Sequence, residues 1–169
     1  MATVPAETSD AANAYAALER RFRRMNLVRE AAGMLQWDMA AMMPPGGAAV
    51  RGEQLATLKV IVHEQMTDPV MADLLDAAEA GADALGPWQR ANLREMRRAW
   101  IHATAVPADL VGALSRATSE SEMRWRTARA ENDFAGLLPL LRQVLDLVRE
   151  AAQIKAARLG VSPYDEIGR

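Results

Sequence analysis

Residues 10–47 read DAANAYAALERRFRRMNLVREAAGMLQWDMAAMMPPGG, and this stretch decides the fold class. Its larger apolar side chains recur every three or four residues, at Tyr15, Leu18, Phe22, Met25, Val28, Ala32, Leu35 and Met39. This spacing places them on one face of an α-helix. Proline lacks an amide hydrogen and glycine adopts turn conformations, so the run Pro44, Pro45, Gly46 and Gly47 ends the helix. We predict a helix that is capped by Ser9 or Asp10, extends to about Met39 and is followed by a tight turn.

The rest of the chain repeats the helical spacing, and no segment alternates apolar and polar residues as a strand would. Further helices are predicted over residues 48–66, 69–78, 87–103, 107–131 and 134–159. Residues 1–169 are therefore expected to form a single all-α domain of about six helices, arranged as an antiparallel bundle or an orthogonal helical array. The four tryptophans are expected to fill the space where helices meet. The last long helix is expected to bury a stripe of Phe134, Leu137, Leu141, Val144, Leu145, Val148 and Ala152.

Composition narrows the classes of function. The chain has 20 basic and 22 acidic residues and a net charge of -2, so no overall positive field attracts nucleic acid. It contains no cysteine, which excludes disulfides, thiolate metal sites and a cysteine nucleophile. No apolar run approaches the roughly 20 residues of a membrane helix, and residues 1–10 do not resemble a signal peptide. We expect a cytoplasmic protein that binds neither nucleic acid nor membrane.

Polar residues give few catalytic candidates. His63-Glu64 begins like the zinc-binding pattern His-Glu-x-x-His, but position 67 is threonine, and the other histidine, His102, lies on a different predicted helix. Glu120 and Glu122 are two residues apart on a helix, so they point in different directions and are expected to face solvent. A cluster of Glu19, Arg20, Arg21, Arg23 and Arg24 suggests either an anion site or a solvated face. A solvated face is the commoner outcome on amphipathic helices.

Several segments together resemble a known family. They are LQWDMAAMMPPGGA (35–48), RGEQLATL (51–58), LREMRR (93–98), VPADL (106–110), ATSE (117–120), ARAENDF (128–134), LPLL (138–141) and PYD (163–165). In this order they are similar to the N-terminal region of the carboxypeptidase Taq family of metallocarboxypeptidases. The resemblance extends from about Tyr15 to Tyr164.

The resemblance implies an all-helical, cytoplasmic and homodimeric enzyme that removes C-terminal residues from peptides with a bound zinc or cobalt ion. Family members are about three times this length, and their metal ligands and catalytic glutamate belong to the part that would follow Arg169. No catalytic or metal-binding residue is therefore carried over, and the chain alone is expected to be inactive and to bind no metal. The family-signature positions Trp37, Asp38, Pro44, Pro45, Gly46, Gly47 and Arg51 are expected to be structural or to line the substrate groove. For Arg51, a groove cation and a surface ion pair remain alternatives.

Two functions remain open. The chain is either the N-terminal groove wall or lid of such an enzyme, which requires the missing C-terminal catalytic portion, or an independent helical module for self-association or partner binding. In both cases an apolar face left uncovered would favour association.

Overall fold

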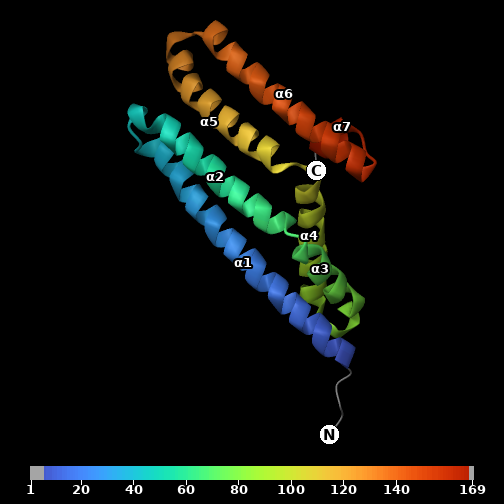
Figure 1. Cartoon of the computed structure of the whole chain (residues 1–169). Coiled ribbons are helices and arrows are strands. Elements are labelled where there is room, and N and C mark those ends of the chain that lie inside the picture. The colour runs from blue at the N-terminus through green and yellow to red at the C-terminus, as the bar shows by residue number, and fades with distance from the viewer. Residues whose placement is uncertain (1–5, 168–169) are drawn as a thin grey trace. The chain divides into compact units, whose positions relative to one another are not determined.

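The computed structural model describes residues 6–167, with side chains from Asp10 to Asp165. Within this part the chain is helical and contains no strand. The helices are α1 (Ala6–Ala41), α2 (Ala48–Thr67), α3 (Val70–Ala80), α4 (Pro87–Ala105), α5 (Ala108–Glu131), α6 (Phe134–Leu159) and α7 (Pro163–Ile167), with 3-10 turns at Pro45–Gly47 and Ala82–Ala84 (Figure 1). The all-α prediction with about six helices is confirmed, and its ranges agree with α2 to α6 within two residues.

The chain separates into two compact units. Unit 1 combines the first part of α1 with residues 64–104, and unit 2 combines residues 28–63 with the segment from Ala105 onward. Helices α1 and α2 each contribute to both units. We describe the units separately, and the prediction of a single domain over residues 1–169 stays a prediction.

Unit 1 packs α3 and α4 with the N-terminal part of α1. Its core consists of buried apolar side chains from these helices, from the end of α2 and from the segment just before α4: Ala11, Ala14, Tyr15, Leu18, Met25, Met66, Met71, Leu75, Ala78, Leu85, Leu93 and Met96. Polar contacts fix the register of the helices. Asn92 on α4 donates to the Tyr15 hydroxyl at 2.9 Å, and Arg97 on α4 is paired with Asp76 and Glu79 on α3. Hydrogen bonding to Glu79 outweighs desolvation and raises the pKa of Arg97.

Unit 2 contains two helical hairpins. The second part of α1 and the first part of α2 form one of them, and α5 and α6 lie side by side as the other, with α7 against α6 (Figure 1). Small residues allow α2 and α5 to approach closely. The β-carbon of Ser119 on α5 would lie 3.6 Å from a β-carbon placed at Gly52, and Gly112 on α5 faces Val60 on α2.

Helix ends follow local sequence signals. Asn132 adopts the left-handed conformation (φ 57) at the end of α5, and Asp133 caps α6 by accepting a hydrogen bond from the amide of Gly136. Gly160 (φ 67) follows α6, whose last residue, Leu159, is the end of the predicted range 134–159. Helix α1 begins at Ala6, before the expected cap, because no proline or glycine between residues 6 and 10 interrupts it. Ser9 lies outside the residues whose side chains are described.

The expected burial of the tryptophans was wrong for three of the four. Trp37, Trp88 and Trp125 are 59%, 88% and 45% exposed, and only Trp100 is half-buried. Trp37 lies two residues from buried Met39, and two residues correspond to about 200° around a helix, so it faces away from the core. Trp125 instead lies against the Arg129 guanidinium, 5.3 Å from its ring centre.

The α6 stripe is also only partly buried. Leu137 and Ala152 are in the core, whereas Phe134, Leu141 and Leu145 are 64%, 39% and 45% exposed. The predicted stripe is wider than the surface that α6 presents to α5, so its outer edge remains uncovered within the described residues.

Candidate functional site

The corner between α1 and α2 brings together the family-signature residues predicted from the sequence. It contains Trp37 and Asp38 in the last turns of α1, the Pro44–Gly47 turn, and Arg51 in the first turns of α2. The amides of Met42 and Met43 both bond to the Asp38 carbonyl, at 2.9 and 2.8 Å, and the amide of Gly47 bonds to the Pro44 carbonyl at 2.9 Å. These bonds close the turn, so the two prolines and two glycines form a well-defined reversal of the chain.

Arg51 holds this corner together. One guanidinium nitrogen, Nη1, donates both to the Leu35 carbonyl at 2.8 Å and to the Asp38 carboxylate at 2.5 Å, while Nε donates to Gln54 at 2.9 Å. The Arg51 side chain is 17% exposed and that of Asp38 35% exposed. The sequence left two alternatives for Arg51, a cation in the substrate groove and an ion pair, and the structure contains the ion pair with Asp38. With its donors directed at α1 and at its own helix, Arg51 has the geometry of a structural clamp.

A second arginine, which the sequence analysis missed, acts on the same helix end. Arg126 on α5 donates to the Met39 carbonyl at 2.7 Å and is held in place by Glu122 at 2.7 Å. Helix α1 has no basic residue in its last turn, so Arg51 and Arg126 supply the positive charge that favours a helix C-terminus. Because Met39 and Arg126 are 87 residues apart, no local pattern indicates this contact.

The other signature residues have simpler surroundings. Trp37 is exposed on the outer side of α1, and Pro44, Pro45 and Gly46 are exposed in the turn. A β-carbon at Gly47 would come within 3.1 Å of the Met43 side chain, a tight contact to which that flexible side chain would have to adjust. The structure thus joins Asp38 and Arg51 directly and places the other five around them. Whether any of them lines a substrate groove stays a prediction.

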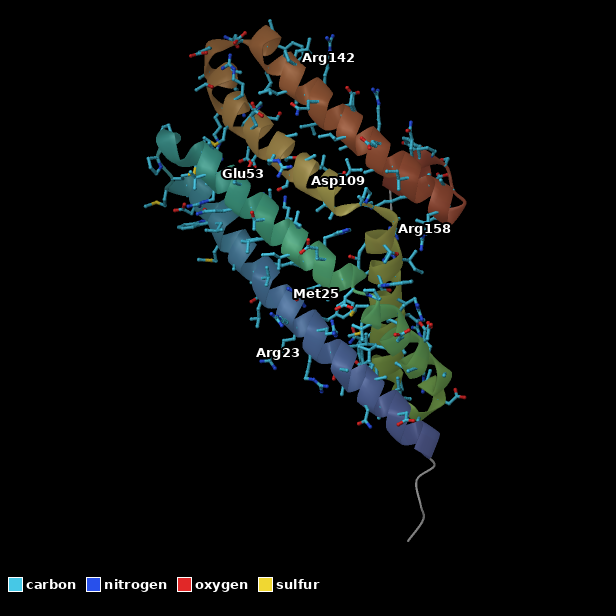
Figure 2. All side chains as sticks on the ribbon, in the orientation of Figure 1. Arg23, Met25, Glu53, Asp109, Arg142 and Arg158 are labelled. Carbon is cyan, nitrogen blue, oxygen red and sulfur yellow. The ribbon has the colours of Figure 1, made fainter. Side chains whose placement is uncertain are left out.

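A cavity of about 440 Å³ lies near this corner, between α2 and α5. It is lined by Ala48, Ala49, Gly52, Glu53, Arg116, Ser119, Glu120 and Met123. Glu53, labelled on α2 in Figure 2, lies 3.8 Å from Arg116, too far for a strong hydrogen bond. Glu120 is exposed, as predicted, but Glu122 is half-buried and paired with Arg126. The two glutamates therefore do not converge as an acid–base pair.

A catalytic metal needs at least three protein ligands that converge on one point. Among the residues whose side chains are described, no three histidine, aspartate, glutamate or cysteine side chains form such a group. His63 and His102 belong to different units and both have interactions with other residues. The residues of this part of the chain therefore do not fit a catalytic metal site. No helix within the described residues is long and apolar enough to cross a membrane.

Known proteins are similar to this chain in sequence and fold. The chain is 36% identical over 136 residues to thermostable carboxypeptidase 1 of Thermus thermophilus, which covers 78% of this chain and 27% of that protein. It is 29% identical over 149 residues to thermostable carboxypeptidase 1 of Pyrococcus furiosus, covering 87% and 29%. The structure of Trypanosoma cruzi metallocarboxypeptidase 1 superimposes with a TM-score of 0.72 at 36% identity, over 91% of this chain and 31% of the other.

The chain therefore spans less than a third of the length of these relatives. A sequence profile of the carboxypeptidase Taq (M32) metallopeptidases matches residues 17–167, which include the Asp38–Arg51 corner and all of α2 to α6. By sequence, length of match and fold, the chain belongs to the carboxypeptidase Taq (M32) metallopeptidase family.

Proposed function

We propose that this chain is the N-terminal helical portion of a metal-dependent, cytoplasmic carboxypeptidase that releases C-terminal amino acids from peptides. Its role is to form a wall or lid of the substrate groove, and it is inactive without the catalytic portion. The observation that carries this proposal is the match of the family profile over residues 17–167 in a chain that spans under a third of its relatives. The sequence after His63-Glu64, which places Thr67 where the zinc motif needs histidine, agrees with it.

The clamped corner supports a structural role in this proposal. Arg51 and Arg126 direct donors at carbonyl groups of α1 and at carboxylates of unit 2, so both side chains are held against the protein. A rigid corner of this kind is suited to positioning a groove wall. Zinc or cobalt would be bound by residues of the catalytic portion alone.

A chimera tests the proposal. In the chimera, this chain replaces the matching N-terminal part of the Thermus thermophilus carboxypeptidase. Hydrolysis of blocked dipeptides is measured in the presence of zinc or cobalt. The isolated chain is assayed under the same conditions for comparison. The chimera should hydrolyse the peptides, whereas the isolated chain should show neither turnover nor stoichiometric metal. Turnover by the isolated chain would contradict the proposal, and so would a folded, metal-loaded chimera without activity.

A second candidate is an independent helical module that self-associates as a homodimer or binds a partner helix. Exposed apolar side chains favour it: Met34 and Trp37 on α1, and Phe134, Leu141 and Leu145 on α6. Sedimentation of the isolated chain distinguishes these surfaces. If α6 is the contact, replacing Leu141 and Leu145 by glutamine should convert a dimer to a monomer, whereas Val50→Gln, at a more exposed apolar position on α2, should not.

A further inference from the structure

The arginine cluster of α1 borders a cavity in unit 1. The cavity has a volume of about 480 Å³ and is lined by Ala17, Arg20, Arg21 and Arg24 on α1, and by Gln65 and Asp68 at and just beyond the end of α2. Ligand pockets in proteins typically measure about 300–1,000 Å³, so this cavity has the size of a small-molecule site. Its lining carries three guanidinium groups and one carboxylate.

The one carboxylate that lines the cavity, Asp68, already accepts hydrogen bonds from other groups of the protein. Asp68 accepts a hydrogen bond from Arg21 through Oδ2 at 3.3 Å, and from the amide of Val70 at the start of α3 through Oδ1 at 3.0 Å. Asp68 therefore anchors Arg21 at the cavity edge and caps α3. It leaves the charges of Arg20 and Arg24 uncompensated.

Arg20 and Arg24 are the free cations of the cavity. Within the described part of the chain, neither has a hydrogen bond or ion pair to another residue. They are one helical turn apart, so their side chains project to the same side of α1, where two like charges repel each other. The end of α2 contributes a partial negative charge of only about half a unit, which does not cancel two full positive charges. The neighbouring carboxylates Glu19 and Glu64 do not line the cavity.

We propose that this cavity binds a multiply charged phosphoryl anion, such as the diphosphate group of a small molecule, between Arg20 and Arg24, with Arg21 at its edge. The planar guanidinium group donates two parallel hydrogen bonds to phosphate oxygens, a geometry that favours arginine over lysine at such sites. The Gln65 amide supplies a neutral donor on the opposite wall. Bound anion would remove the repulsion between the two arginines. Arg20, Arg23 and Arg24 are exposed, as predicted for a solvated face, and the proposed site is independent of any peptidase activity.

Arg23 provides a matched control because it belongs to the same cluster but does not line the cavity. It is exposed, and Figure 2 shows its side chain on the opposite side of α1 from buried Met25. Replacing Arg20, Arg23 or Arg24 by glutamine removes one positive charge in each case and leaves the core intact. A non-specific attraction to a positive helix would respond equally to all three changes, whereas a site would not.

The experiment is a calorimetric titration of the full chain with pyrophosphate at low and at about physiological ionic strength, with circular dichroism confirming that each variant is folded. We expect saturable one-to-one binding that weakens with salt. Arg20→Gln and Arg24→Gln should each lower the affinity about tenfold, and Arg23→Gln should change it less than about twofold. Absence of saturable binding would overturn the proposal. Equal losses in all three variants would overturn it too, as would an affinity for citrate, which offers carboxylates, equal to that for pyrophosphate.

Discussion

Removing the Arg51 side chain should destabilise unit 2 by an amount that the structure allows us to work out. Arg51→Ala removes a charged donor to the Leu35 carbonyl at 2.8 Å and the ion pair with Asp38 at 2.5 Å. A hydrogen bond from a charged group contributes about 1.5 kcal/mol, and a partly exposed ion pair about 0.5 kcal/mol. We therefore expect the free energy of unfolding to fall by about 2 kcal/mol. For a chain of this size that corresponds to a drop of roughly 4–8 °C in Tm.

Urea unfolding followed by circular dichroism at the helical band measures this change. Arg149→Ala is the matched control, because Arg149 pairs with Asp146 on α6 at 3.6 Å with both side chains more than half exposed. The control should lose less than about 0.5 kcal/mol. A double-mutant cycle with Asp38→Asn then isolates the ion pair, with an expected coupling of about 0.5–1 kcal/mol. A loss for Arg51→Ala no larger than that of the control would refute the role of Arg51 as a clamp.

Three further outcomes follow from local geometry. Asp133→Ala removes the α6 cap and the ion pair with Arg124, and should lower the free energy of unfolding in urea by about 1–2 kcal/mol; an unchanged midpoint would mean that the cap contributes nothing. Asn132→Ala places an L-residue with a β-carbon at φ 57, where the β-carbon is strained, and should lower the free energy of unfolding by about 1 kcal/mol. Asn132→Gly should leave the free energy of unfolding unchanged or raise it, and the opposite order would contradict the left-handed geometry. Burial raises the pKa of Tyr15 above its ordinary value of 10, so the folded state holds this proton more tightly than the unfolded state. The stability that this protonated hydroxyl contributes is complete below pH 10 and is lost as the pH rises through the pKa of the folded state. The urea midpoint should therefore fall less above pH 10 in Tyr15→Phe than in the unchanged chain. An equal fall in both would show that Tyr15 does not cause the loss of stability.

Local signals in the sequence were sufficient for most of the secondary structure. The apolar spacing located the long helices, and the predicted ranges 107–131 and 134–159 end at the residues where α5 and α6 end. Helix α7 was missed although its start carries a local signal: Ser162 bonds to Asp165, three residues later, and Pro163 occupies the first helical position.

Burial and long-range contacts were not available from local patterns. The exposure of Trp37 depends on which face of α1 is covered, and apolar character alone does not specify that face. The ion pair of Arg51 was one of two alternatives because Asp38 is 13 residues away, across a turn whose geometry only the structure provides. The cavity beside Arg20 and Arg24 also depends on α2, whose end supplies the opposite wall.

The bond from Arg126 to the Met39 carbonyl has a consequence for the order of folding during synthesis. A ribosome releases the chain from its N-terminus, so all residues that close unit 1 have emerged once Thr104 is free. The Met39 carbonyl, near the end of α1, receives its hydrogen bond only after Arg126 of α5 has been synthesised. Unit 1 can therefore complete its core while unit 2 still lacks a partner for the α1–α2 corner. Helix α1 is synthesised before α5, yet its last turn is completed only later, because an arginine translated 87 residues after Met39 closes it.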